Sequence, residues 1–81
     1  MITNKIVSAF PMPDFCIAVT FRNGIQGIFD MRPYLEEGVF RRLQDVRLFN
    51  AVRVDYGTLV WPEDIDIAPD TVEAELIVQK S

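Results

Sequence analysis

The dipeptide Asn23-Gly24 lies between two segments rich in β-forming residues, and it is the feature that most constrains how this chain can fold. Residues 15–21 alternate large with small side chains, and residues 25–30 resume the strand pattern. Asn-Gly is typical of a two-residue type I′ turn, because both central residues of that turn need a positive φ. The sequence therefore predicts an antiparallel hairpin over residues 15–30.

A two-residue loop would also set the register of this hairpin. Phe21 would face Gln26, Val19 would face Ile28, and Ala18 would face Phe29. One face would then carry Ile17, Val19, Phe21 and Ile28. The opposite face would carry Cys16, Ala18, Ile25, Phe29 and Met31. Since neither face is polar, we expect the second face to be covered, either by the chain's own loops or by another subunit.

The rest of the chain favours short elements. Residues 5–10 are typical of a strand, and we expect Pro11–Asp14 to end it, since proline cannot donate to a ladder. After Asp30 the pattern predicts short helical turns, the last of them over residues 46–50 with Asp45 as its N-cap. Residues 51–55 and 58–61 predict a second hairpin, in which Gly57 supplies the left-handed position.

The C-terminal third begins with an acidic segment, residues 63–70, which the sequence predicts to be a loop. Asp70 and Glu73 match a capping box ahead of a helix over residues 71–76. Residues 76–79 fit either a continuation of that helix or an edge strand. Together these patterns predict one α+β domain over residues 1–81, with a mostly antiparallel sheet of four or five strands, including two hairpins, and short helices packed on one face.

Composition excludes the common catalytic designs. The 81 residues contain no histidine, one cysteine and four glycines. Catalytic pairs that use histidine and zinc sites built from cysteine and histidine are therefore impossible, and no glycine-rich nucleotide motif occurs. We expect a protein that is not an enzyme and that needs no cofactor. A single cysteine and the absence of a long apolar stretch indicate a cytoplasmic protein without a membrane span.

Charge is distributed unevenly along the chain. Residues 1–54 hold seven basic and five acidic side chains, whereas residues 55–81 hold one basic and seven acidic side chains. The net charge of −4 argues against nucleic acid as the main partner, because neutralisation of phosphates supplies most of that affinity. Four arginines between residues 41 and 53 would form at most a local basic face.

Four groups of residues are candidates for function. Glu63, Asp64, Asp66 and Asp70 would suit a hard divalent cation, but their spacing does not match an EF-hand, and a solvated acidic loop that ends in a helix cap is the favoured interpretation. Asp30 and Arg32 form either a ligand-binding ion pair or a structural corner. Trp61 with Tyr56 forms either an aromatic platform or part of the core. Cys16 is expected to be a small buried apolar residue rather than a reactive thiol.

Several landmarks occur together in a fixed order: the Asn-Gly hairpin, Phe29-Asp30-Met31-Arg32-Pro33, Trp61-Pro62, and Asp66 four residues before Asp70. In this the chain resembles a small bacterial family of unknown function, whose members occur alone or joined to a helix-turn-helix DNA-binding domain. The resemblance covers about residues 5–72. It departs from the family at Glu63-Asp64, where glycine or asparagine often follows the Trp-Pro pair.

The resemblance implies an α+β domain with an antiparallel sheet and supplies no catalytic residues. It also implies a gene arrangement similar to that of toxin–antitoxin pairs. We therefore expect a small non-enzymatic module that binds another small bacterial protein or a second copy of itself, as the neutralising or regulatory half of a two-protein system. The alternative is a small-ligand or divalent-metal domain that uses the acidic segment. The candidate interface residues are Arg22, Ile25, Phe29, Asp64, Asp66 and Asp70.

Overall fold

The computed structural model describes residues 4–78, whose strands form two antiparallel sheets. The larger sheet has the order β1 (Ile6–Met12), β2 (Cys16–Phe21), β3 (Gln26–Asp30) and β7 (Ile77–Val78). The smaller sheet has the order β4 (Arg53–Asp55), β5 (Thr58–Trp61) and β6 (Ile65–Ile67). The α+β class and both predicted hairpins are confirmed, and a separate small sheet is added to the predicted one.

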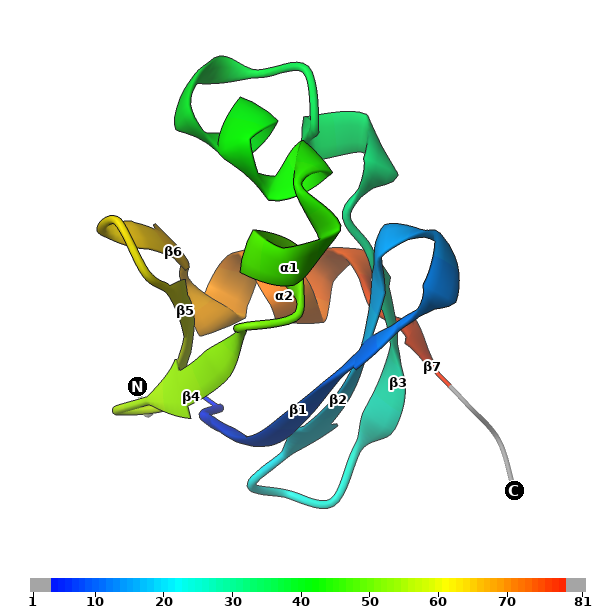
Figure 1. The fold of residues 1–81 in the computed structure, drawn as a ribbon. Coiled ribbons are helices and arrows are strands. Elements are labelled where there is room, and N and C mark those ends of the chain that lie inside the picture. The colour runs from blue at the N-terminus through cyan, green and yellow to red at the C-terminus, as the bar shows by residue number, and fades with distance from the viewer. Residues whose placement is uncertain (1–3, 79–81) are drawn as a thin grey trace.

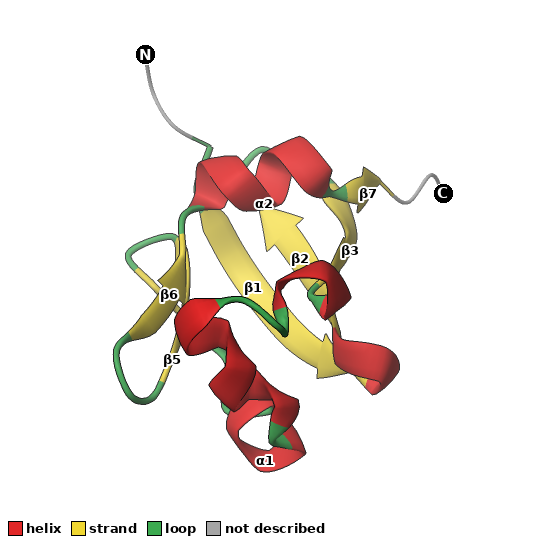
Figure 2. Cartoon of the chain, turned by 90° about the horizontal axis from the view of Figure 1, so that it is seen from above, coloured by secondary structure: helices red, strands yellow, loops and turns green. Residues whose placement is uncertain are grey.

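Five short helical segments connect the strands of residues 4–78. Three are 3-10 turns, η1 (Pro13–Phe15), η2 (Arg32–Tyr34) and η3 (Gly38–Gln44), and two are α-helices, α1 (Val46–Phe49) and α2 (Pro69–Glu75). Figure 1 shows the sheets on opposite sides of the molecule with α1 and α2 between them. Seen from above, α2 leads from the smaller sheet to β7 at the edge of the larger one (Figure 2).

The hydrophobic core fills the space between the two sheets. The larger sheet contributes one face of its three long strands, and the smaller sheet contributes Leu59, Trp61, Ile65 and Ile67. Phe49 of α1 and Val72 of α2 also belong to it, each almost fully buried, and the connecting segments add Met31, Leu35, Leu43 and Val52. The Trp61 indole N–H is satisfied there, because it donates to the carbonyl of Phe49 at 3.0 Å.

The register of the β2–β3 hairpin differs from the prediction by one residue. Ala18 pairs with Ile28, and Ile17 pairs with Phe29. The cause is a three-residue loop: the Gly24 N–H donates to the Phe21 carbonyl at 2.9 Å, and Gly24 has φ +93°. This is a type I turn with a G1 bulge, in which the Asn23 Oδ1 accepts the Ile25 N–H at 3.1 Å. The slip moves Phe29 onto the core face.

The sequence predicted that Pro11 would end the first strand, and this prediction is wrong. Pro11 lies within β1 and pairs with Ile17. β1 is an edge strand, where a residue without an N–H can be accommodated because one side of the strand has no ladder partner. The chain turns later, at η1, where Asp14 and Phe15 both have positive φ.

The predicted loop of the acidic segment also contains a strand. Ile65 and Ile67 of β6 are buried, and Asp66 between them faces outward. The capping box is wrong: α2 begins at Pro69, its N-cap is Ala68, and Asp70 lies within the first turn without capping it. The N-cap at Asp45 is confirmed, since its side chain accepts the Arg47 N–H at 3.0 Å.

Residues 77 and 78, which the sequence left open between helix and strand, form β7 and pair with Ile28 and Gly27. Residue 79 lies outside the described residues. Gly27 is required here, because a Cβ at this position would fall 2.4 Å from the Ile77 carbonyl oxygen and 2.7 Å from the Leu76 side chain. The absence of a side chain at Gly27 therefore lets the backbone of β7 come close enough to pair with β3.

Candidate protein-interaction surface

One face of the larger sheet packs on the core, and the opposite face, here called the outer face, points away from it. Cross-strand pairing places one residue from each strand in a single row across the outer face: Phe10, Ala18, Ile28 and Ile77. A second row, from β1 to β3, holds Met12, Cys16 and Asp30. A third holds Ser8, Thr20 and Gln26. Directly paired residues lie on the same face of a sheet, so the outer face has an apolar centre and a more polar row on one side.

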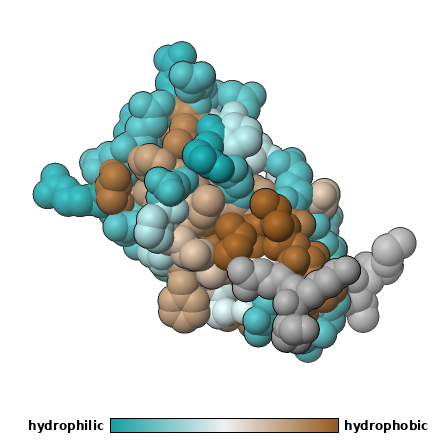
Figure 3. Space-filling view, turned by 90° about the vertical axis from the view of Figure 1, so that its right-hand side faces the viewer, coloured by the Kyte–Doolittle hydropathy of each residue, from teal (hydrophilic) through white to brown (hydrophobic). Residues whose placement is uncertain are grey.

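The apolar row of the outer face is accessible. Phe10 is 65% exposed and Ile77 is 62% exposed, with Ala18 and Ile28 half-buried between them. Figure 3 shows hydrophobic side chains gathered on this side of the molecule. Single exposed apolar residues are ordinary, but a continuous group of them marks an interaction surface. Among residues 4–78 no helix covers this face, since the helices lie on the core side.

The free edge of β1 is protected against strand addition. The Ile6 N–H donates to the Gly57 carbonyl at 3.1 Å, which attaches the start of β1 to the β4–β5 turn. Farther along, Pro11 has no N–H to offer a partner strand. A partner therefore has access to the outer face more readily than to this edge.

Only part of the predicted interface lies where the sequence placed it. Arg22 is exposed at the tip of the β2–β3 hairpin, and Ile25 beside it is 38% exposed. Phe29 is 0% exposed, because the register places its ring in the core. The second face proposed from sequence is thus corrected: Ile28 belongs to it, whereas Phe29 and Met31 are buried by the chain itself.

The acidic residues of the predicted interface and metal site are spread over separate elements. Glu63 and Asp64 form the tight β5–β6 turn with positive φ, Asp66 faces outward from β6, and Asp70 lies on α2. Glu63 is in an ion pair with Arg42. Within residues 4–78 no three acidic or cysteine side chains are grouped closely enough to hold a metal ion.

Asp30 and Arg32 form a structural corner at the end of β3. The Arg32 backbone N–H donates to Asp30 Oδ1 at 2.9 Å, and the guanidinium binds both carboxylate oxygens, at 3.0 Å from Nε and 2.8 Å from Nη2. These hydrogen bonds from Arg32 lower the pKa of Asp30. The pair is satisfied internally, so it offers little unused hydrogen-bonding capacity to a ligand.

Cys16 lies on the outer face and is half-buried rather than fully buried. Burial, followed by the nearby Asp30 carboxylate, raises the pKa of its thiol. The thiol therefore stays protonated near neutral pH and behaves as a small apolar group on this surface.

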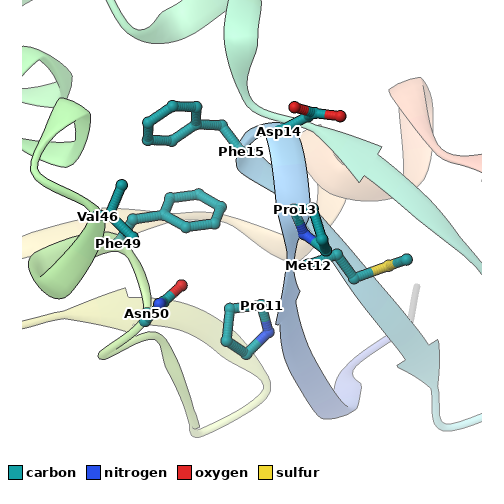
Figure 4. Close-up of a pocket in the computed structure, with 8 residues that line it drawn as sticks. All are labelled: Pro11, Met12, Pro13, Asp14, Phe15, Val46, Phe49 and Asn50. Carbon is teal, nitrogen blue, oxygen red and sulfur yellow. The ribbon is translucent and has the colours of Figure 1, made fainter.

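The aromatic platform of Trp61 and Tyr56 does not form, since Trp61 is in the core and Tyr56 is 91% exposed at the β4–β5 turn. A cavity of about 390 Å³ opens instead between the β1–β2 tip and α1. Figure 4 shows its walls, with Pro11 and Pro13 opposite Phe49 and Asn50. Sequence reasoning missed this hollow and also Phe10, although the alternation around Phe10 gave a signal once Pro11 is accepted inside a strand.

Comparison with known proteins agrees with the sequence landmarks. Residues 6–77 match the model of a family described as "Protein of unknown function (DUF2442)". The chain belongs to this family. No match was found among curated proteins or among solved structures. The matched residues include every strand of both sheets except the last residue of β7, so the outer face is made almost entirely of residues within the family domain.

Across residues 4–78 there is also no helix with the length and apolar character needed to cross a membrane.

Proposed function

We propose that this member of the family is a non-enzymatic protein-interaction module, and that it binds its partner through the outer face. The observation that carries this proposal is the exposed row that runs from Phe10 to Ile77 across all four strands of the larger sheet. Covering such a row removes apolar surface from water, which is worth about 25 cal/mol for each Å² buried.

The titratable groups support a role without catalysis. A general acid or base works best with a pKa near the working pH. Burial, and next the hydrogen bond to Glu75, raise the pKa of Tyr34 to about 12. The pKa of Asp30 is lowered by Arg32, and that of Cys16 is raised mainly by burial. Each shift moves the pKa of the group farther from pH 7, so the group keeps its ordinary charge state near neutral pH.

The surface chemistry favours a protein as the partner. The outer face is apolar at its centre, whereas the chain as a whole has a net charge of −4. That charge would repel the phosphates of a nucleic acid, and an apolar face has no cationic side chains to neutralise them. In its most specific form the proposal makes this protein the neutralising or regulatory half of a two-protein bacterial pair in the cytoplasm, which is supported by family resemblance alone.

The proposal is tested by quantitative co-purification of the tagged full chain from its native cells. Ile77→Ser removes part of the apolar row, and Val39→Ser is the matched control, because Val39 is exposed on η3 away from the sheet. A partner protein recovered with the wild type and with Val39→Ser, but depleted with Ile77→Ser, supports the proposal. Equal recovery with both variants would overturn the assignment to the outer face.

A further inference from the structure

We propose that the occupant of the outer face is a second copy of this chain, packed face to face about a two-fold axis. This inference rests on the proposed function and names the partner for that same surface. The observations that support it are the apolar row and the charged residues at the two ends of the sheet, and the size of the face limits the strength of the association.

Charges of opposite sign lie at opposite ends of the larger sheet. Lys5 and Arg22 are neighbours at one end, where the Arg22 N–H donates to the Lys5 carbonyl at 2.7 Å. Asp14 lies at the other end, at the β1–β2 tip, close to the internally compensated pair of Asp30 and Arg32. The Lys5 side chain lies against Gly57, and Asn4 beside it donates to Glu73 at 2.9 Å. The exposed Arg22 is therefore the cation at one end, and the exposed Asp14 is the anion at the other.

This arrangement is complementary to itself in one orientation. A two-fold axis that runs along the row from Phe10 to Ile77, perpendicular to the strands, reverses the strand direction of the second copy. The apolar row then packs on its own symmetry mate, and Arg22 of each copy approaches Asp14 of the other. An axis parallel to the strands would instead bring like charges together, which is unfavourable. The charge pattern therefore selects the first orientation.

The size of the face sets the strength of the association. The seven residues of β1 extend about 23 Å, and four strands about 4.8 Å apart span roughly 15–19 Å. The footprint is on the order of 400 Å² per copy, about half of the ~800 Å² per partner that a stable interface buries. A face of this size is smaller than a stable interface needs, so the expected dimer is weak and forms only at high protein concentration.

Sedimentation equilibrium of the full chain over about 10 µM to 1 mM tests the inference. The expected mass rises from that of the 9.3 kDa monomer toward twice that value. Phe10→Ser should weaken the association by more than about tenfold, because in a symmetric dimer the substitution removes the ring from both copies. Arg22→Glu should weaken it about threefold to tenfold, and the exposed Arg47→Glu, on α1, should not. Circular dichroism confirms that each variant is folded.

The outcomes separate this inference from the proposed function. If the chain sediments as a monomer at every concentration, the inference that a second copy binds the outer face is overturned. The proposed function would still stand if a different protein co-purifies and its recovery depends on Ile77. A dimer that is insensitive to Phe10→Ser would overturn the face-to-face interface. A dimer that is weakened by Phe10→Ser but equally affected by Arg22→Glu and Arg47→Glu would overturn the two-fold orientation.

Discussion

Replacing Phe29 tests the register on which the outer face depends. The observed pairing puts the Phe29 ring in the core and Ile28 on the outer face, whereas a two-residue turn would exchange their positions. Phe29→Ala should therefore be strongly destabilising, and Ile28→Ala should cost much less. The exposed Phe10 of the same sheet provides a matched control, since Phe10→Ala removes the same atoms from a side chain that remains in water.

The expected magnitude follows from the burial of the ring. A buried aromatic side chain removes roughly 150–250 Å² from water, which at about 25 cal/mol per Å² amounts to ~4–6 kcal/mol. Measured truncations of buried phenylalanine cost about 3–5 kcal/mol, so we expect ~4 kcal/mol for Phe29→Ala. Because Ile28 is half-buried, Ile28→Ala should lower the free energy of unfolding by about 1–2 kcal/mol, and Phe10→Ala should lower it by less than about 1 kcal/mol.

Urea unfolding followed by the fluorescence of Trp61, the single tryptophan, measures these costs. With a stability of about 5 kcal/mol, the lower end for a small domain, and an m-value near ~1 kcal/mol per M, Phe29→Ala would retain only about 1 kcal/mol and lose most of its folded baseline. Phe29→Leu, at ~2 kcal/mol, keeps a measurable midpoint about 2 M lower than that of the wild type. If Ile28→Ala proved more destabilising than Phe29→Ala, the observed register and the outer face derived from it would both be refuted.

Four further predictions concern three single contacts and the binding of divalent metal. Gly27→Ala should destabilise by about 1–3 kcal/mol and release β7, seen as faster amide exchange at Ile77, because the new Cβ would collide with that backbone; unchanged exchange would contradict the close approach. Asp45→Ala should cost about 1 kcal/mol in urea unfolding through the lost N-cap, and Asp45→Asn much less. Burial and the 2.5 Å hydrogen bond to Glu75 raise the pKa of Tyr34 to about 12, so stability should fall as pH rises from about 10 to about 12, and Tyr34→Phe should flatten that fall. Adding Ca²⁺ or Mg²⁺ should leave the Tm unchanged, whereas an increase that scales with metal concentration would restore a metal site in the acidic segment.

Local signals predicted the elements whose geometry depends on a few neighbouring residues. Gly57, with φ +80°, turns the β4–β5 hairpin as its sequence indicated, and Asp45 caps α1. Both features are decided by backbone conformation and by one hydrogen bond within two residues. Two short strands were not fixed in the same way. β6 is brought against β5 by the tight turn at Glu63 and Asp64, and β7 is a strand only through its pairing with the distant β3.

The candidate surface shows the same division between local and tertiary information. Arg22 was placed at an exposed turn correctly, because a turn tip is exposed in either register. Phe29 was placed on the wrong face, since one additional loop residue reverses every side chain beyond it. Asp64, Asp66 and Asp70 were treated as one site because they are close in sequence, but a turn, a strand and a helix direct them apart.

The sequence by itself determined the α+β class, the two hairpins and the absence of histidine chemistry, because strand alternation, turn residues and composition are properties of the chain at short range. Only the tertiary structure decided which face of the larger sheet is buried. Asn23-Gly24 is compatible with both a two-residue and a three-residue loop, and the second allows Phe29 to enter the core with Ile17. Burial of that ring outweighs the small difference between turn types, and it leaves the row from Phe10 to Ile77 facing outward.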